Sequence, residues 1–238
     1  MQVRIRHEAP IAELTRRFPA FGPLHFARIA PLEHRRWQRE DGAGHSHDLQ
    51  VVFLGKSGYG KSSLVNALSG IPAMATSDVA ACTRVIQSVE YAIRPGHYLS
   101  LADLPGLGES QQRDREYLAL YREMLEKVDV VVYTLRADCR DYSIDQRAFA
   151  ELFPPATRGQ RVILALNGCD KIEPLQRQDS RTPSSAQLLN IERKLAELRG
   201  LFPGVTSLVP CSAATGWNLD ALGQAIMRLL RRDQGVAF

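Results

Sequence analysis

Short apolar stretches alternate with helical patterns along most of the chain. Repeated alternation of this kind predicts an α/β fold in which helices cover both faces of a mostly parallel, six-stranded sheet. The runs of apolar and β-branched residues that predict strands are Leu49–Leu54, Val85–Ile93, Tyr98–Leu101, Val128–Leu135, Arg161–Leu166 and Val205–Val209. Apolar residues at helical spacing predict helices at Ser63–Leu68, Glu109–Lys127, Ile144–Phe153, Ala186–Arg199 and Leu219–Arg231.

Two connections change this simple picture. Pro95-Gly96 joins the second and third predicted strands, and a turn this short predicts an antiparallel hairpin there. The segment Lys171–Ser185 is polar and contains proline, so we expect a loop. In sheets of this class, ligands bind beyond the carboxyl ends of the strands, where we therefore expect the functional residues.

The first 48 residues follow a different pattern, and we expect a helical extension and linker (residues 1–48) before the main domain (residues 49–238). Ile11, Leu14 and Phe18 are spaced for one short amphipathic helix. A second helix is predicted over Phe26–Arg39, and the glycine-rich run Asp41–His47 is typical of a linker.

Composition limits the class of protein. The chain has 238 residues, 45% hydrophobic and 24% charged, which are globular values, and its net charge of +4 is too small to argue for a polyanionic partner. Its four cysteines form no C-x-x-C pair, which favours a reducing cytoplasm over a disulfide framework. We find no secretory signal and no apolar run of about 18 residues, so we expect a cytoplasmic protein that is at most peripheral to a membrane.

The most specific motif follows the first strong strand. The run Gly55-Lys56-Ser57-Gly58-Tyr59-Gly60-Lys61-Ser62 matches the phosphate-binding pattern G-x-x-x-x-G-K-[ST]. A strand precedes it and a helix follows it, so backbone N–H groups at the helix N-terminus can enclose a phosphate chain. The sequence therefore predicts that the chain binds a nucleoside triphosphate.

Each polar residue of this motif has an expected role. The Lys61 ammonium can bridge the β- and γ-phosphates, and we expect it to assist catalysis. The Ser62 hydroxyl can coordinate Mg²⁺, and Ser63 can donate a hydrogen bond to the α-phosphate.

A second motif, Asp103-Leu104-Pro105-Gly106, follows the predicted strand Tyr98–Leu101. An acidic residue at this strand end can hold Mg²⁺ through water, which makes Asp103 a metal-site candidate. Gly106 has no Cβ, so its backbone N–H can approach the γ-phosphate.

A third and a fourth motif indicate the base. In Asn167-Gly168-Cys169-Asp170, the Asp170 carboxylate can accept hydrogen bonds from both N1–H and the exocyclic amine of guanine. Asn167 can tie this loop to the phosphate-binding loop. Ser212-Ala213 follows the last predicted strand, where the Ala213 N–H could donate to the guanine O6.

The order of these four motifs resembles the translation-factor-related regulatory GTPases, and the resemblance covers about Leu49 to the C-terminus. The runs Ser77–Arg84 and Asp103–Ser110 are similar to the Era/TrmE-like branch, and the second to its bacterial YfjP/YeeP-type members. The resemblance implies a P-loop NTPase G domain that binds GTP or GDP with Mg²⁺. It also implies that Thr83 is a switch threonine that binds Mg²⁺ and senses the γ-phosphate.

The chain departs from the family pattern at four positions, one of which, Gly58, stands where potassium-assisted members have an asparagine that binds K⁺, so we expect no potassium stimulation. Gly168 and Ala214 stand where lysine stems usually pack over the guanine ring, so we expect micromolar affinity and fast exchange. Leu107 stands where Ras-type enzymes have a water-orienting glutamine, so we expect slow intrinsic hydrolysis. The candidate replacements for that glutamine are Arg84, Glu109, Gln111 and Gln112.

Several functions remain open at this point. The leading one is a GTP-hydrolysing switch that acts on an unknown protein or RNA effector, either as a monomer or as a nucleotide-dependent dimer. The alternative is a nucleotide-binding module with negligible catalysis that acts by exchange. A small-molecule kinase and a dynamin-like membrane GTPase are disfavoured, because the first has no use for the base motifs and the second needs a long helical stalk.

Overall fold

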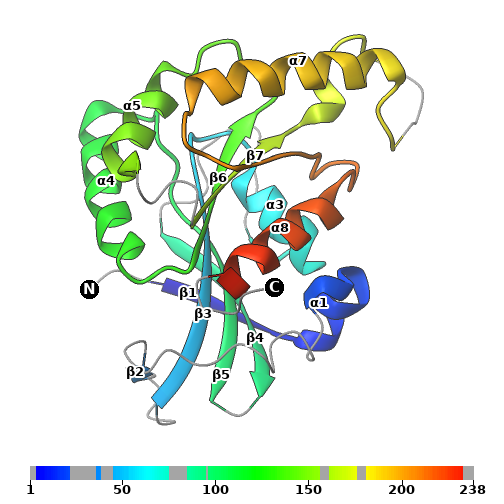
Figure 1. Ribbon diagram of the computed structural model, residues 1–238. Coiled ribbons are helices and arrows are strands. Elements are labelled where there is room, and N and C mark those ends of the chain that lie inside the picture. The colour runs from blue at the N-terminus through cyan, green and yellow to red at the C-terminus, as the bar shows by residue number, and fades with distance from the viewer. Residues whose placement is uncertain are drawn as a thin grey trace.

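The computed structural model describes residues 4–21, 36–38, 45–74, 85–94, 96–155, 161–175 and 181–232. Its sheet has the strand order β1-β4-β5-β3-β6-β7-β8, and β2 pairs with β3 beside this path (Figure 1). The pairs β4/β5 and β2/β3 are antiparallel and the others are parallel. The strands are β1 (Arg4–Pro10), β2 (Arg36–Gln38), β3 (His45–Leu54), β4 (Ile86–Arg94), β5 (His97–Asp103), β6 (Val130–Arg136), β7 (Val162–Asn167) and β8 (Ser207–Pro210).

Helices cover both faces of this sheet (Figure 1). They are α1 (Ile11–Arg17), α3 (Lys61–Ser69), α4 (Gln111–Leu125), α5 (Ser143–Leu152), α7 (Ser185–Leu201) and α8 (Leu219–Arg232), with 3-10 turns η1 (Pro19–Phe21) and η3 (Cys169–Lys171). Helix α7 begins with a capping box between Ser184 and Gln187, which satisfies N–H groups that have no partner within the helix. In the part of the chain that the structure describes, no helix is both long and apolar enough to span a bilayer.

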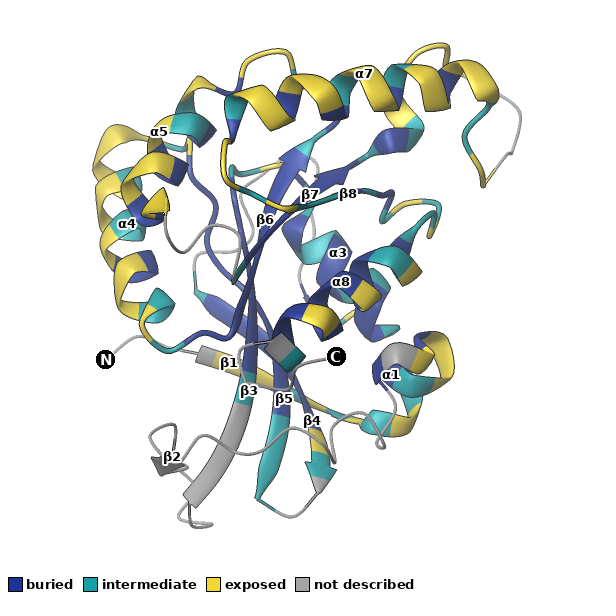
Figure 2. Cartoon of the chain, viewed as in Figure 1, coloured by how far each residue is buried: buried dark blue, intermediate teal, exposed yellow. Residues whose placement is uncertain are grey.

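The central strands are buried on both faces, as Figure 2 shows. Successive strand residues point to opposite faces, so Val51 and Phe53 of β3 join one core cluster with α3 and α8. Val52 and Leu54 join a second cluster with α4, α5 and α7. The near-continuous apolar runs of the sequence have this cause, because each side of a central strand needs apolar residues.

The structure confirms the α/β class, with the predicted strands observed as β3 to β8 and the predicted helices as α3, α4, α5, α7 and α8. The antiparallel hairpin of β4 and β5 is also observed. The strand count was too low, because the sheet has eight strands among the described residues and not six. Both additional strands, β1 and β2, come from the N-terminal segment.

The prediction of a helical N-terminal extension was wrong in two places. Residues Arg4–Pro10 form β1, which pairs with β4 and has Arg6 beside the buried Glu90 at 3.4 Å. Residues Arg36–Gln38 form β2 and not the end of a helix, and the expected linker residues His45–His47 belong to β3. Strand β1 forms by backbone pairing with a distant segment, and β2 pairs with the nearby His45–His47, and local apolar spacing reveals neither pairing.

One N-terminal prediction was correct. Helix α1 forms where the spacing of Ile11, Leu14 and Phe18 indicated it, and Leu14, Phe18 and Phe21 are buried in the core cluster of α3 and α8. The boundary expected at residue 48 falls inside β3. The remainder of the predicted second helix lies outside the described residues.

Candidate nucleotide-binding site

The phosphate-binding loop connects the end of β3 to the start of α3. Gly55 and Gly60 have φ angles of +137° and +83°, a region that other residues rarely adopt. A Cβ at Gly55 would lie 2.4 Å from the Thr134 carbonyl oxygen, and one at Gly60 would lie 2.4 Å from Asn167 Nδ2. The glycines therefore allow the loop to pass directly against β6 and β7.

A second loop, Leu104–Gly108, packs on the phosphate-binding loop. The Ser57 N–H donates to the Leu107 carbonyl at 2.7 Å, and the Leu107 N–H donates to the Gly55 carbonyl at 3.2 Å. A Cβ on Gly106 would lie 2.6 Å from Ser57 Cα and 2.8 Å from Lys61 Nζ. The structure thus brings Gly106 to the lysine that is expected to meet the γ-phosphate.

Lys61 is buried at the base of these two loops, with 6% of its surface exposed. Its Nζ donates to the Lys56 carbonyl at 3.3 Å. Burial lowers the pKa of Lys61, and the negative charges of Asp103, Glu109 and Asp145 oppose this effect. A buried cation at this position favours binding of an anionic ligand.

Ser62 and Asp103 form the candidate metal site. Ser62 Oγ donates to Asp103 Oδ2 at 2.5 Å, so a hydroxyl and a carboxylate oxygen already lie together. Mg²⁺ prefers oxygen ligands and takes others from phosphates and water, so the pair fits this ion. Among the described residues no group of three or more His, Cys, Asp or Glu could hold a metal. Thr83, the third predicted ligand, lies outside the described residues.

Asn167 joins the phosphate side of the site (the loops Gly55–Ser62 and Leu104–Gly108) to its base side (the two loops that contain Asp170 and Ala213). Its Nδ2 donates to the Tyr59 carbonyl at 3.0 Å, and its Oδ1 accepts from the Ala213 N–H at 3.0 Å. The first bond is the tie expected from the sequence. The second differs from the expectation, because the Ala213 N–H that was assigned to the guanine O6 donates to Asn167 here.

Asp170 and Ser212 meet on the base side. Ser212 Oγ donates to Asp170 Oδ1 at 2.6 Å and accepts from the Thr215 N–H at 3.2 Å. Gly168, in the left-handed region at φ +77°, begins the turn that carries Asp170. Hydrogen bonding thus orients the carboxylate that was predicted to read the base.

A groove of about 820 Å³ runs between α3 and the loop after β8. Ser63 and Ala213, both predicted to contact the nucleotide, line it together. The other residues that line it are Arg17, Asn66, Ala67, Gly70, Ile71, Pro72, Arg181, Ala214, Thr215, Gly216 and Leu219. Ser63 and Ala213 therefore face one common space.

The sequence did not indicate the buried network behind the phosphate-binding loop. The Tyr59 hydroxyl donates to Asp145 Oδ2 at 3.1 Å and lies 3.2 Å from Cys139 Sγ. The Tyr133 hydroxyl donates to Asp145 Oδ1 at 3.3 Å. Burial raises the pKa of Asp145 to about 6, and the bonds from the two tyrosines oppose this shift. Asp145 is 86 positions from Tyr59, and no local motif links them.

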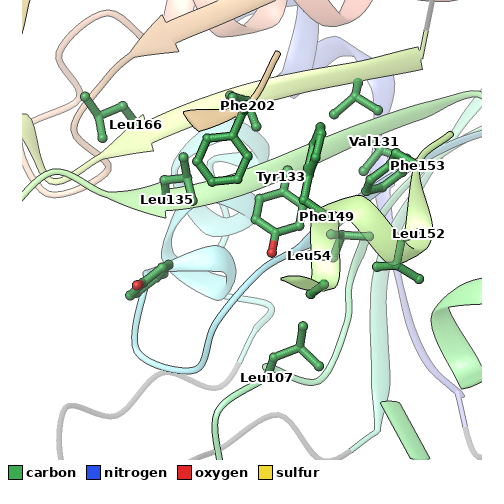
Figure 3. Close-up of a cluster of buried hydrophobic side chains, with 14 of the residues drawn as sticks. Leu54, Leu107, Val131, Tyr133, Leu135, Phe149, Leu152, Phe153, Leu166 and Phe202 are labelled. Atoms are coloured by element: carbon green, nitrogen blue, oxygen red, sulfur yellow. The ribbon is translucent and has the colours of Figure 1, made fainter. Parts of the chain in front are cut away.

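Leu107 is 1% exposed and belongs to the apolar cluster that includes Leu54, Tyr133 and Phe149 (Figure 3). Its side chain therefore packs in the core. It offers no hydrogen-bonding group to a water, as its residue type already indicated.

Comparison with known proteins agrees with this geometry. Residues 50–168 match the protein family described as 50S ribosome-binding GTPase. Over 184 residues, or 77% of the chain, it is 37% identical to the uncharacterized protein YkfA and 35% identical to the uncharacterized protein YfjP, both of Escherichia coli K12. The matched stretch spans 62% of the length of each of these relatives.

A solved structure gives the same fold. A single-residue variant of Era from Aquifex aeolicus, bound to GDP and AlF4−, superimposes with a TM-score of 0.62 at 25% identity. The superposition covers 76% of the chain and 56% of that Era chain. The likeness agrees with the α/β GTPase fold described above.

Proposed function

The chain belongs to the family of 50S ribosome-binding GTPases, and from this premise we propose that it is a Mg²⁺-dependent molecular switch that binds GTP and hydrolyses it to GDP and phosphate. The observation that carries the proposal is the double hydrogen bond of Asn167. One amide connects the Tyr59 carbonyl of the phosphate-binding loop to the Ala213 N–H of the base loop. This connection supports a single site that contains both the phosphate and the base motifs.

On the phosphate side, we assign the β- and γ-phosphates to Lys61 and to the N–H groups at the start of α3. Gly106 approaches Ser57 and Lys61 closely enough for its backbone to meet the γ-phosphate end of the site. Ser62 and Asp103 would hold Mg²⁺, which neutralises phosphate charge when bound. The switch role of Thr83 remains a prediction from the family resemblance.

On the base side, we assign recognition of guanine to Asp170, which Ser212 orients. A carboxylate accepts from N1–H and the exocyclic amine of guanine, and adenine does not present this pair of donors. Gly168 and Ala214 supply no apolar stems to cover the ring, which supports micromolar affinity and fast exchange.

Slow hydrolysis is part of the proposal, because the Leu107 side chain is buried in the core and has no hydrogen-bonding group. The same observation favours the alternative function, a nucleotide-binding module with negligible catalysis that acts by exchange. Single-turnover measurement of phosphate release separates the two. Measurable release that depends on Mg²⁺ supports the switch, and GTP binding without release supports the alternative.

The partner of the switch is proposed only as a class. We propose a protein or RNA effector that recognises the segments around Thr83 and Gly106, in the cytoplasm. Gly106 lies against Ser57 and Lys61 of the phosphate-binding loop. A partner that contacts this segment would therefore respond to the presence of the γ-phosphate.

A nucleotide panel tests the proposal. Isothermal calorimetry with GTP, GDP, ATP and XTP is combined with phosphate release in Mg²⁺ and in EDTA. We expect dissociation constants on the order of 1 μM for GDP and GTP, and at least about hundredfold weaker binding of ATP. Equal binding of ATP would contradict the base assignment, and subnanomolar binding of GDP would contradict the predicted weak affinity.

A further inference from the structure

Hydrolysis of GTP requires a group that orients the attacking water, and Leu107 cannot supply it. The inference here rests on the proposed function and concerns which residue takes this role. Two other candidates, Gln111 and Gln112, are exposed on the first turn of α4. Arg84 lies outside the described residues.

Glu109 differs from these candidates because its carboxylate is buried. Its side chain is 9% exposed, and Oε2 accepts a hydrogen bond from Arg113 Nη1 at 2.7 Å. Oε1 is also buried, and within the described part of the chain it has no hydrogen-bond partner. An unsatisfied buried carboxylate oxygen is costly, so its presence indicates a ligand that completes the bond.

The position of Glu109 identifies this ligand. It follows Gly106 by three residues, and a Cβ on Gly106 would collide with Ser57 and Lys61. The negative charge of Glu109 acts on the Lys61 ammonium and opposes the effect of burial on its pKa. The carboxylate thus lies in the electrostatic range of the lysine that is assigned to the γ-phosphate.

Helix α4 holds Glu109 in this position. The Gly108 N–H donates to Asp114 Oδ1 at 2.7 Å, and the Arg113 N–H donates to Ser110 Oγ at 3.2 Å. Gly108 has a φ angle of +84°, which turns the chain sharply before Glu109. With the Arg113 ion pair, these contacts anchor both the backbone and one oxygen of the side chain.

We propose that Glu109 Oε1 binds the water that attacks the γ-phosphate and accepts its proton. The water oxygen forms a bond to the γ-phosphorus, and the bond from that phosphorus to the β–γ bridging oxygen breaks. The electron pair of the broken bond stays on the β-phosphate of GDP. The proton taken by Glu109 passes to the released phosphate, which returns the carboxylate to its starting state.

The test compares E109Q and E109A with E116Q, a matched change on the exposed face of α4, where Glu116 accepts from Gln112 at 3.3 Å. E109Q keeps the shape of the side chain and removes its ability to take a proton. Single-turnover phosphate release should fall about 100-fold or more in E109Q and E109A. GTP affinity by calorimetry should stay within about twofold of wild type, because the group acts on water and not on the nucleotide.

R113A adds a second readout, because it frees the carboxylate without removing it. Its rate should fall less than that of E109Q, by about three- to tenfold. E109Q that hydrolyses GTP at the wild-type rate would overturn the role of Glu109 and leave the proposed GTPase function standing. A wild-type chain that binds GTP and releases no phosphate would overturn both.

Discussion

The phosphate side and the base side of the site are built in different ways. The phosphate side consists of two loops joined by backbone hydrogen bonds, and glycines at Gly55, Gly60 and Gly106 permit their close approach. On the base side, the side chains of Asn167 and Ser212 are connecting groups. A backbone bond from the Cys169 N–H to the Cys211 carbonyl at 3.1 Å joins the same two loops. Backbone contacts that need glycine shape the phosphate side, which also contains the buried ammonium of Lys61. On the base side, the Ser212 side chain orients the carboxylate that is proposed to read the base.

The largest expected effect is on the phosphate side. Lys61→Ala removes the buried ammonium and should weaken GTP binding about a thousandfold, or about 4 kcal/mol. Lys127→Ala is the matched control, because that lysine is on the surface, 3.9 Å from Glu123. Fluorescence titration with a labelled GTP analogue measures both variants. A loss below about tenfold for Lys61→Ala would refute its assignment to the phosphates.

The next prediction concerns Asp145, in the buried network behind the phosphate-binding loop. The folded chain holds the Asp145 proton up to about pH 6, whereas an ordinary aspartate releases it near 3.8. Folding stability therefore falls as pH rises through this interval, and Asp145→Asn removes the fall. Relative to wild type, the free energy of unfolding of this variant should rise by up to about 3 kcal/mol between about pH 4 and pH 7.

Urea unfolding across this pH range measures the Asp145 effect. Asp141→Asn is the control, because hydrogen bonds from Ser143 lower the pKa of that exposed carboxyl. The stability of this control relative to wild type should stay nearly constant over this range, because a carboxyl with a pKa below 3.8 is ionised in both the folded and the unfolded chain above about pH 4. Parallel pH profiles for wild type and Asp145→Asn would show that Asp145 is not protonated in the folded chain.

A smaller effect is expected from the base side. Asp170→Asn should weaken GTP binding about hundredfold and shift the preference toward XTP, because an amide can donate to the xanthine 2-oxo group. Asp220→Asn, an exposed carboxylate in the first turn of α8, is the control. Competition calorimetry with both nucleotides checks the shift, and an unchanged preference would refute the assignment of Asp170.

The smallest effect is expected from adding to the base side a lysine stem that it lacks. Ala214→Lys restores a stem that can cover the guanine ring, and should tighten GDP binding about fivefold, or about 1 kcal/mol. Ala214→Ser provides a control of similar size without the stem. Stopped-flow release of labelled GDP should slow by the same factor. An unchanged release rate would show that the missing stem does not limit affinity.

The parts of the fold that could be predicted from the sequence are those with local signals. Helix α5 and strand β6 were found because their apolar residues follow a helical or continuous pattern. Strand β1 was missed because it has few apolar residues and forms by pairing with β4, where Arg4 lies opposite the distant Ile86. Strand β2 was missed because it has only three residues and pairs with His45–His47, part of a run that is typical of a linker.

In the site, too, the residues with local motifs could be predicted and the long-range contacts could not. The residues of the phosphate and base motifs lie near each other as their strand ends indicated, because parallel strands bring their carboxyl ends to one edge. The Tyr59–Asp145 contact and the bond from the Ala213 N–H to Asn167 could not be predicted. Such contacts depend on side-chain packing between distant segments, which no spacing in the sequence records.

Strand β1 also covers the edge of the sheet that β4 would otherwise form. An uncovered β4 would present unpaired backbone groups to other chains, and pairing with β1 removes that opportunity. The new outer strand contains the exposed charges of Arg6 and Glu8 and ends at Pro10. Charged side chains and proline discourage strand addition, so the N-terminal segment protects this edge of the protein from aggregation.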